Sequence, residues 1–373
     1  MFVVFVLAVG LVQSLGNGRT AQSSSAPERI PSAKLSSSEM AELRSKAAVG
    51  DAAAQVVLGR GYQDGNGVSQ NDELAASWYR KAAEQGNATA QNNLGIMYRT
   101  GSGVEKSKEE AVKWYRKAAQ QGYANAMFNL GTAYYNGDGV PSDVFRAYDW
   151  FLLAQEAGSS SASDAVRRTG NEMGPSARND ALLEVADMCE KGVELPQNYA
   201  EAAKWYGRAV DLKDPRAMVK LASILVNGSG VPQDNAQAFQ LCRTAAKEYP
   251  PAQYCVGYLY QQGLGVPQDY AEAAKWYEKS AAGRHSPAYL ALGQMCWKGQ
   301  GLKTDLVAAY LWFFQAYTEG RQSAKSLGNS VLQEMTPDEK KRLDKKLRER
   351  HLDPTKVRQL MEAGAMPSPS TTR

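Results

Sequence analysis

Residues Gly50–Gln85 read GDAAAQVVLGRGYQDGNGVSQNDELAASWYRKAAEQ, and residues Gly86–Gln121 read GNATAQNNLGIMYRTGSGVEKSKEEAVKWYRKAAQQ. Each stretch has 36 residues, and the two agree at Ala, Leu-Gly, Tyr, a pair of glycines and Trp-Tyr. A third copy runs from Gly122 to Ala157, and four more follow it. The seven copies place these residues at the position of the tyrosine: Tyr62, Tyr98, Tyr134, Cys189, Leu225, Tyr260 and Cys296. Self-similarity at one period is the signature of a repeat architecture, so the chain is predicted to hold seven repeats.

Each repeat is predicted to form two helices joined by a glycine turn. In the second repeat, Ala90, Leu94 and Tyr98 are spaced to lie on one face of the first helix. Gly95 lies on the same face and allows another helix to approach closely. Glycine ends a helix because it adopts a positive φ without steric cost. Six of the seven turns carry two glycines: Gly65 and Gly67, Gly101 and Gly103, Gly137 and Gly139, Gly228 and Gly230, Gly263 and Gly265, Gly299 and Gly301.

The second helix of each repeat is predicted to begin at a capping residue. Ser, Asn and Asp side chains accept hydrogen bonds from the free N–H groups at a helix start. The expected caps are Asn71, Ser107, Asp143, Asn198, Asp234, Asp269 and Asp305. The tryptophan of this helix is expected to be buried with an alanine, as in Trp78 with Ala82. Helix, glycine turn, cap and helix at a period near 36 residues predict a right-handed, all-α solenoid with a C-terminal capping helix.

Two irregularities divide the predicted solenoid. The fourth repeat contains KGVELPQN, which keeps Gly192 but has Glu194 in place of the second glycine, so either a kink or a weak joint is expected there. The stretch from Arg146 to Pro175 also aligns without gaps 162 residues downstream. An extra helix is therefore expected after the third repeat and after the seventh. We predict a first block of three repeats over residues 38–176 and a second block of four repeats over residues 177–352.

The two ends of the chain have different compositions from the repeats. Residues 2–12 are apolar, too few for a membrane-spanning helix but enough for the core of a secretory signal. We therefore expect residues 1–16 to be a signal peptide and the protein to be periplasmic or secreted; a misassigned start would leave it cytoplasmic. Residues 17–37 are predicted to be a disordered linker, with Ser38 capping the first helix. Residues 353–373 are predicted to be a mostly disordered tail.

Composition points away from an enzyme and from nucleic acid as the main partner. The 373 residues include 43 basic and 39 acidic side chains, a net charge of only +4. The two histidines, His285 and His351, are far apart in the sequence and are expected on the surface. The chain therefore has too few histidines to favour a histidine metal site or a serine–histidine relay. The sequence also contains no GxSxG, SxxK or phosphate-loop motif. No catalytic residue, cofactor or metal is predicted.

The block A-x3-L-G-x2-Y-x2-G-x-G-V, followed by the cap and A-x2-W-Y-x-K-A-A, resembles the Sel1-like repeat family, relatives of the tetratricopeptide repeats. The resemblance extends from Gly50 to about Glu319. It implies an adaptor that binds a peptide or protein partner, of unknown identity, in the concave groove of a solenoid. Some cysteine-rich relatives are described as β-lactamases, so an envelope hydrolase is the alternative. That alternative would use a groove acid such as Asp64 or Asp187.

By the same resemblance, the groove is lined by the first helix of each repeat, at four positions around the landmark tyrosine. The main candidates for protein binding are Arg60, Asn92, Arg99, Phe128, Tyr135, Tyr254, Tyr258, Gln261 and Trp297. The other groove positions of these repeats are Val56, Gln63, Asp64, Ile96, Thr100, Thr132, Asn136, Gln262, Leu290, Gln294 and Lys298. Amides suit hydrogen bonding to a peptide main chain and aromatic rings suit side-chain pockets. The alternative is that some of the aromatic residues pack between repeats.

Cysteines and a basic run complete the predictions. Cys242 and Cys255 lie at similar distances from a predicted turn, so neighbouring helices either bring them within disulfide reach or leave both free. Cys189 and Cys296 are expected to be small core residues. The run KKRLDKKLRER, residues 340–350, is predicted to be a solvated capping helix. Weak contact with an acidic membrane through its leucines is the alternative, and nucleic acid is an unlikely partner.

Overall fold

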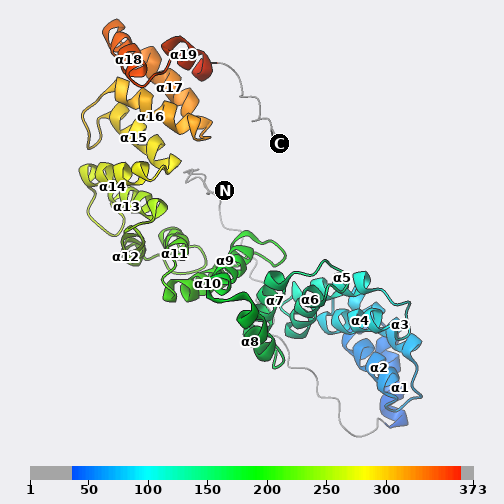
Figure 1. The fold of residues 1–373 in the computed structure, drawn as a ribbon. Coiled ribbons are helices and arrows are strands. Elements are labelled where there is room, and N and C mark those ends of the chain that lie inside the picture. The colour runs from blue at the N-terminus through cyan, green and yellow to red at the C-terminus, as the bar shows by residue number, and fades with distance from the viewer. Residues whose placement is uncertain (1–35, 363–373) are drawn as a thin grey trace.

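The computed structural model describes residues 36–362, and this part of the chain consists of helices without a strand (Figure 1). Seven helix pairs confirm the predicted repeats: α2 (Ala52–Asp64) with α3 (Asp72–Glu84), α4 (Ala88–Thr100) with α5 (Lys108–Ala119), α6 (Ala124–Asn136) with α7 (Val144–Glu156), α9 (Pro175–Lys191) with α10 (Tyr199–Asp211), α11 (Pro215–Asn227) with α12 (Asn235–Ala245), α13 (Pro250–Gln262) with α14 (Tyr270–Ala282), and α15 (Ser286–Lys298) with α16 (Leu306–Thr318). The helices outside these pairs are α1 (Ser37–Ala48), α8 (Ala162–Met173), α17 (Ser323–Glu334), α18 (Pro337–Glu349) and α19 (Pro354–Glu362).

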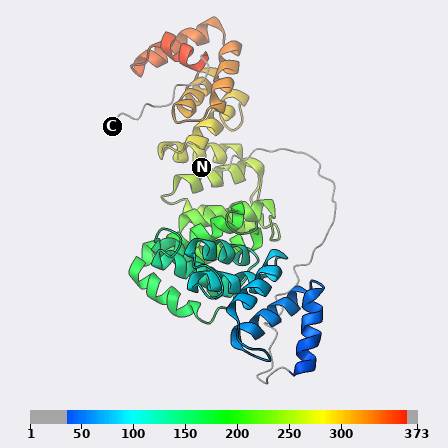
Figure 2. The same ribbon diagram turned by 90° about the vertical axis from the view of Figure 1, so that its right-hand side faces the viewer.

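The pairs stack in chain order into an extended, curved array, with α1 at one end and α18 and α19 at the other (Figures 1 and 2). Each helix packs against its own partner and against the next pair, so the apolar core is a series of clusters along the array. This is the arrangement of an α-solenoid, in which a repeat contacts only its neighbours. Within residues 36–362, no helix has both the length and the apolar character needed to cross a membrane.

The glycine turns have the predicted geometry. In the second repeat, Gly101 ends α4 with a φ of 83°, and its N–H donates to the carbonyl oxygen of Met97 at 2.7 Å. Gly103 has a φ of 67°, and a side chain there would place its Cβ 2.1 Å from the carbonyl oxygen of Asp72 in the preceding pair. The second glycine is therefore required both by its backbone angle and by the close approach of the neighbouring repeat.

The caps are confirmed, but the prediction for the tryptophans is partly wrong. All seven predicted capping side chains accept a hydrogen bond from the start of their helix. Trp78 is only half-buried, whereas the next residue, Tyr79, is fully buried. In the second repeat the corresponding Tyr115 packs directly on Gly95, where a Cβ would lie 2.6 Å from the ring. The close approach predicted at Gly95 is thus made by the residue after the tryptophan.

Both ends of the described chain differ from the predicted boundaries. Ser36, not Ser38, caps α1, because Glu39 lies three residues after Ser36 and completes a capping box. The predicted disordered tail begins at residue 353, but residues 354–362 form α19. Val357 and Met361 are four residues apart and buried, which gives this short helix an apolar face against the core. The expectations for residues 1–35 and 363–373 lie outside the described residues.

Candidate binding groove

A large cavity lies along the first helices of three consecutive repeats, α11, α13 and α15. Its volume is about 450 Å³. It is lined by the predicted groove residues Tyr254, Tyr258, Gln261, Gln262, Leu290, Gln294 and Lys298, and by Val219, Ala222, Ser223, Val226, Pro251, Cys255, Leu259, Tyr277, His285, Pro287, Ala291 and Arg321. Positions four and eight residues apart on one helix, such as Tyr254, Tyr258 and Gln262, therefore gather in one cavity with the positions 36 residues later.

Three aromatic side chains form one wall of this cavity. The ring centroid of Tyr254 lies 5.3 Å from that of Tyr277 and 5.5 Å from that of His285. His285 was expected on the surface, but its ring is half-buried because it packs on Tyr254 at the start of α15. Burial lowers the pKa of His285 to about 4, with a further contribution from the positive charge of Arg321. The histidine is therefore neutral near pH 7 and contributes an apolar and hydrogen-bonding surface.

The polar groups of the cavity are amides and cations. The Tyr277 hydroxyl donates to Gln261 Oε1 at 2.7 Å, which fixes the orientation of this amide. Arg321 Nε donates to the hydroxyl of Ser286 at 3.1 Å, and Lys298 is exposed at the end of α15. None of the lining residues is acidic. The cavity therefore favours a ligand that combines apolar or aromatic surface with negative charge.

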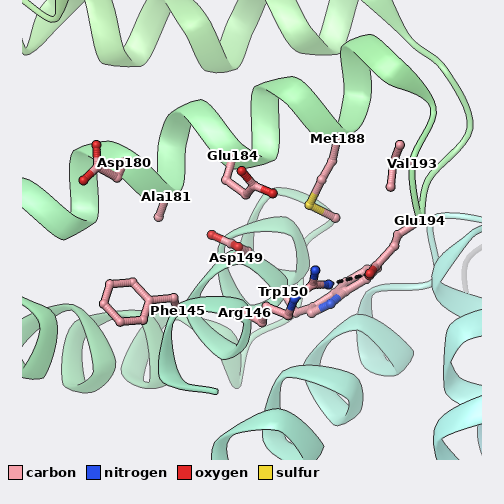
Figure 3. A pocket seen from close by; sticks show the side chains of 10 residues that line it. All are labelled: Phe145, Arg146, Asp149, Trp150, Asp180, Ala181, Glu184, Met188, Val193 and Glu194. Carbon is pink, nitrogen blue, oxygen red and sulfur yellow. Dashed lines mark hydrogen bonds and ion pairs between the residues drawn. The ribbon is translucent and has the colours of Figure 1, made fainter. Parts of the chain in front are cut away.

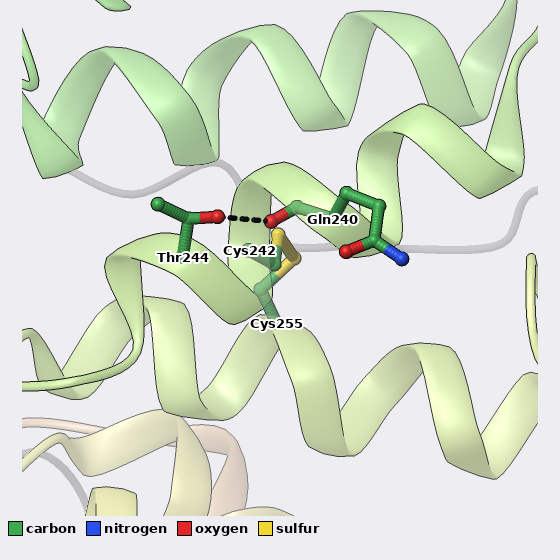
Figure 4. The surroundings of a disulfide bond; sticks show 4 residues. All are labelled: Gln240, Cys242, Thr244 and Cys255. Atoms are coloured by element: carbon green, nitrogen blue, oxygen red, sulfur yellow. Dashed lines mark hydrogen bonds between the residues drawn. A yellow bond between two sulfur atoms is a disulfide. The ribbon is translucent and has the colours of Figure 1, made fainter.

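A disulfide bond joins Cys242 in α12 to Cys255 in α13 (Figure 4). Of the two alternatives left by the sequence, the structure has the bridged one, with the Cα atoms 5.9 Å apart. Cys242 is fully buried, whereas Cys255 lines the cavity. The bridge therefore anchors one wall of the cavity to the core. Cys189 and Cys296 are free and buried, as expected for core residues.

The candidates of the first two repeats do not gather in a cavity of this kind. Arg60 forms an exposed ion pair of 3.5 Å with Asp64, and Arg99 is also exposed. Asn92 is buried, and its Oδ1 accepts a hydrogen bond of 2.8 Å from Asn129 in the next repeat. Asn92 thus has a structural contact that links two neighbouring first helices.

Three aromatic candidates next to the extra helices also have partners within the chain. The Tyr135 hydroxyl donates to Glu172 of α8 at 2.9 Å, and Trp297 Nε1 donates to Glu334 of α17 at 2.7 Å. Tyr135 and Trp297 are 162 residues apart, as are Glu172 and Glu334, so the two hydrogen bonds occupy equivalent positions in the two blocks. Phe128 packs on a core phenylalanine with ring centroids 5.5 Å apart. The extra helices therefore each provide a glutamate that binds an aromatic side chain of the last first helix of the block.

The acids proposed for the hydrolase alternative have no catalytic setting. Asp187 accepts hydrogen bonds from Lys191, Tyr206 and Lys220. Burial acts in the opposite direction, but these bonds hold the pKa of Asp187 below its usual value. Asp64 lies in its exposed pair with Arg60, and neither acid lines the large cavity. Among residues 36–362, no three His, Cys, Asp or Glu side chains gather as they would around a metal ion.

The basic C-terminal run forms α18. Leu343 and Leu347, its apolar stripe, are fully buried and pack into the last core cluster. The stripe therefore stabilises the end of the solenoid and does not face the solvent. The exposed face of α18 keeps its lysines and arginines.

Among the cavity members that sequence reasoning missed are His285, Arg321 and Tyr277. His285 and Arg321 lie in the connections after α14 and α16, outside the four groove positions of the repeat. Tyr277 belongs to a second helix and reaches the cavity because it packs beside the glycine of α13. A signal was available for His285, because it comes directly before α15, a first helix that borders the cavity.

Comparison with known proteins identifies the repeat. Seven segments of the chain match the Sel1 repeat: residues 52–87, 88–123, 124–159, 179–214, 215–248, 250–285 and 286–320. Protein sel-1 homolog 2 of Rattus norvegicus is 31% identical over 107 residues, which are 28% of this chain and 16% of that protein. The Homo sapiens protein of the same name is 28% identical over 127 residues, 32% of this chain and 18% of its own. The chain thus spans less than a fifth of the length of these curated relatives.

Two solved structures are also similar. The crystal structure of c5321, a protective antigen present in uropathogenic Escherichia coli strains displaying an SLR fold, is 27% identical, with a TM-score of 0.44. The match covers 90% of this chain and 76% of that one. A Sel1 repeat protein from Oxalobacter formigenes is 31% identical, with a TM-score of 0.31 and coverage of 65% of this chain and 90% of that one.

Proposed function

Because this chain belongs to the Sel1 repeat family, whose members generally mediate protein–protein interactions, we propose that it is a binding scaffold that holds a peptide segment in the cavity between α11, α13 and α15. The observation that carries the proposal is the composition of that cavity. Tyrosines and amides line its walls, Lys298 and Arg321 lie at its edges, and none of its residues is acidic.

The chemistry of the cavity suggests the kind of segment that it takes. An extended peptide offers main-chain N–H and C=O groups, which the amides of Gln262 and Gln294 can pair. An apolar or aromatic side chain of the peptide fits against Tyr254 and Tyr258, since aromatic rings supply large contact areas at interfaces. A carboxylate on the peptide, from Asp, Glu or the C-terminus, suits the cationic edge. We therefore expect a segment with an apolar residue next to negative charge.

A photocrosslinking residue at Gln262 tests the location. Gln262 is exposed and lines the cavity, whereas Gln240 is exposed on α12, a second helix outside it. A partner that is captured in cells through position 262 and not through position 240 would support this groove. Equal capture at both positions would contradict the groove, and no specific capture at either position would contradict binding itself.

Charge reversal at Lys298 tests the chemistry with a matched control. Lys298 lines the cavity and Lys303 does not, although both are exposed and only five residues apart. Lys298→Glu is expected to weaken binding of the captured segment and to reduce its dependence on salt, while Lys303→Glu leaves both unchanged. Equal effects of the two substitutions would show that only the overall charge of the protein matters.

We also propose that the chain is exported. The apolar run at residues 2–12 supports this, and a disulfide bond such as Cys242–Cys255 persists mainly in oxidising compartments. The intact mass of the protein purified from the cell envelope or medium tests the proposal. A chain shortened by about the first 16 residues is expected. A full-length mass and a cytoplasmic location would contradict it.

A further inference from the structure

The junction between the third and fourth repeats differs from every other junction in the described chain. Elsewhere the second turn glycine packs tightly on the preceding pair; at Gly265, for example, a Cβ would lie 2.1 Å from the carbonyl oxygen of Asn235. The fourth repeat has Glu194 at this position, with a φ of 64°, so that close packing is sterically impossible. Helix α8 is also inserted before α9. A cavity of about 270 Å³ lies between α7 and α9 as a result (Figure 3).

The walls of this acidic cavity are apolar and its polar groups are mostly carboxylates. Trp150 of α7 and Met188 of α9 are buried on opposite sides of it, and Phe145 lies at one end with 57% of its surface exposed. Asp149 projects from α7 and Glu184 from α9 into the space between the two helices (Figure 3). Phe145 and Val193 are both exposed hydrophobic residues at this cavity, so apolar surface is available at its opening.

Asp149 is an unusual buried acid. Only 4% of its surface is exposed, and its Oδ1 has no hydrogen-bond partner within the described structure. Glu194 Oε2, on the opposite side of the same cavity, is also buried without a partner. Buried polar atoms are nearly always hydrogen-bonded, so two unpaired carboxylate oxygens at one cavity indicate a missing donor.

The cations already present satisfy only part of this negative charge. Arg146 Nη1 forms an ion pair of 2.5 Å with Glu194 Oε1. Asp180, at the rim, is paired with Arg216 at 2.6 Å. Within residues 36–362, no hydrogen bond or ion pair reaches Asp149 Oδ1 or the carboxylate of Glu184. The acids also do not form a metal-binding cluster in the described chain.

We propose that the acidic cavity between α7 and α9 binds an organic cation, an alkylammonium group whose N–H donors pair with Asp149 and Glu184 and whose carbon chain packs on Trp150, Met188 and Phe145. An ammonium group has three donors and no acceptor, which suits a cavity whose polar groups are mostly carboxylates. Its alkyl stem suits the apolar walls. The source of the group is either a free polyamine or a lysine side chain of a partner protein. This site is separate from the groove on α11, α13 and α15.

Binding is expected to be coupled to the release of a proton. Burial raises the pKa of Asp149 to about 8, and repulsion from Glu184, Asp143 and Glu194 acts in the same direction, while Arg146 opposes it. In the empty cavity Asp149 is therefore mostly protonated at pH 6 to 7. An ammonium group requires the ionised form, so its affinity should rise up to about tenfold per pH unit between pH 6 and 8 and level off above that.

Calorimetric titration of the full-length protein tests the site directly. The probes are cadaverine, a lysine-containing tripeptide and pentanol as a neutral analogue. Cadaverine or the tripeptide is expected to bind and pentanol is not. Tighter binding of cadaverine identifies a free polyamine as the source, and tighter binding of the tripeptide identifies a lysine side chain. If neither cation binds at pH 8, the proposal is wrong.

Two substitutions assign the binding to this cavity. Asp149→Asn removes the buried charge and is expected to weaken binding about thirtyfold or more, and to abolish its dependence on pH. Asp164→Asn is the matched control, because Asp164 lies on the neighbouring helix α8, is exposed and does not line the cavity. Circular dichroism establishes that both variants are folded. Equal affinities for Asp149→Asn and the unmodified protein, or equal losses in both variants, would overturn the assignment.

Discussion

Replacing Asp149 by asparagine should stabilise the protein, and the gain should depend on pH. In the unfolded chain the carboxyl has its ordinary pKa near 4, whereas burial in the fold raises the pKa to about 8. Between these values the folded state binds one more proton than the unfolded state. The free energy of unfolding therefore falls as pH rises, by about 1.4 kcal/mol per pH unit from this group. Asparagine is neutral in both states and removes this slope.

The size of the effect follows from the two pKa values. At pH 7 the unfolded carboxyl is ionised, and folding must bring a proton onto it at a cost of about 4 kcal/mol. The amide avoids that cost, but it replaces an oxygen without a partner by an amide that is also incompletely bonded, a penalty of about 1 to 2 kcal/mol. The expected net gain for Asp149→Asn is therefore about 2 to 3 kcal/mol at pH 7. Near pH 4 the gain should vanish or change sign.

Urea unfolding at several pH values measures this difference. Trp150 and Trp205 are fully buried in the core cluster that contains α7, so their fluorescence reports on the relevant part of the solenoid. Other titrating groups contribute equally to both proteins and cancel in the comparison. The exposed Asp164→Asn should show no pH-dependent difference from the unmodified protein. A constant difference between Asp149→Asn and the unmodified protein from pH 4 to 8 would refute the reasoning, because it would show that Asp149 is ionised in the fold.

Three further outcomes are expected. Gly95→Ala should lower stability by about 1 to 3 kcal/mol, because its Cβ would lie 2.6 Å from a buried tyrosine ring. Gly207→Ala is the control in the same urea titration: the space at its Cβ is open, so this substitution should raise stability by up to about 1 kcal/mol. Replacing Cys242 and Cys255 together by alanine should lower stability by about 3 kcal/mol, since the bridge spans 13 residues. The unmodified protein, when denatured without reduction, should show two reactive thiols. Four reactive thiols would mean that the bridge does not form. The pKa of His285 in the fold is lowered to about 4, so its contribution to stability should be complete above pH 6.5 and be lost toward pH 4. The loss is at most about 1.4 kcal/mol per pH unit. His285→Gln should reduce this slope of stability against pH, and an unchanged slope would assign it to other groups.

The repeats were predictable because their signals are local. A cap such as Asp143 acts on the N–H of a residue three positions later, and a glycine such as Gly101 determines its own backbone angle. Both effects can be identified from a few neighbouring residues, and the 36-residue period repeats them seven times. The number of helix pairs and the position of each turn follow directly.

Burial within each helix was harder to predict, because it depends on how two helices cross. Trp78 and Tyr79 are adjacent and differ by about 100° around the helix, so a small change in crossing decides which of them faces the core. The structure buries Tyr79 on Gly59, and Lys81 covers the ring of Trp78 at 4.1 Å. The angle at which the two helices cross cannot be derived from the period and the composition alone.

The contacts of the groove candidates depend on elements far away in sequence. Tyr135 and Glu172 are 37 residues apart, and their hydrogen bond exists because α8, packed against α7, brings Glu172 to the end of α6. The sequence predicted the extra helix but not the surface that it covers. His285 and Arg321 join the large cavity from connections that the repeat pattern does not include. A groove assigned by position within a repeat is therefore incomplete wherever connections and extra helices border it.

The groove and the acidic cavity arise in physically different ways. The groove on α11, α13 and α15 follows regular stacking, so most of its walls come from three first helices, and His285 and Arg321 join it from the connections. The acidic cavity lies at a junction without regular stacking: Glu194 replaces a glycine that the packing requires, and α8 is inserted in sequence between the two helix pairs. A left-handed residue other than glycine and a buried acid without a donor both destabilise the fold. Because both unfavourable features occur at the same junction, together with an exposed phenylalanine, a binding role explains them better than irregular packing alone.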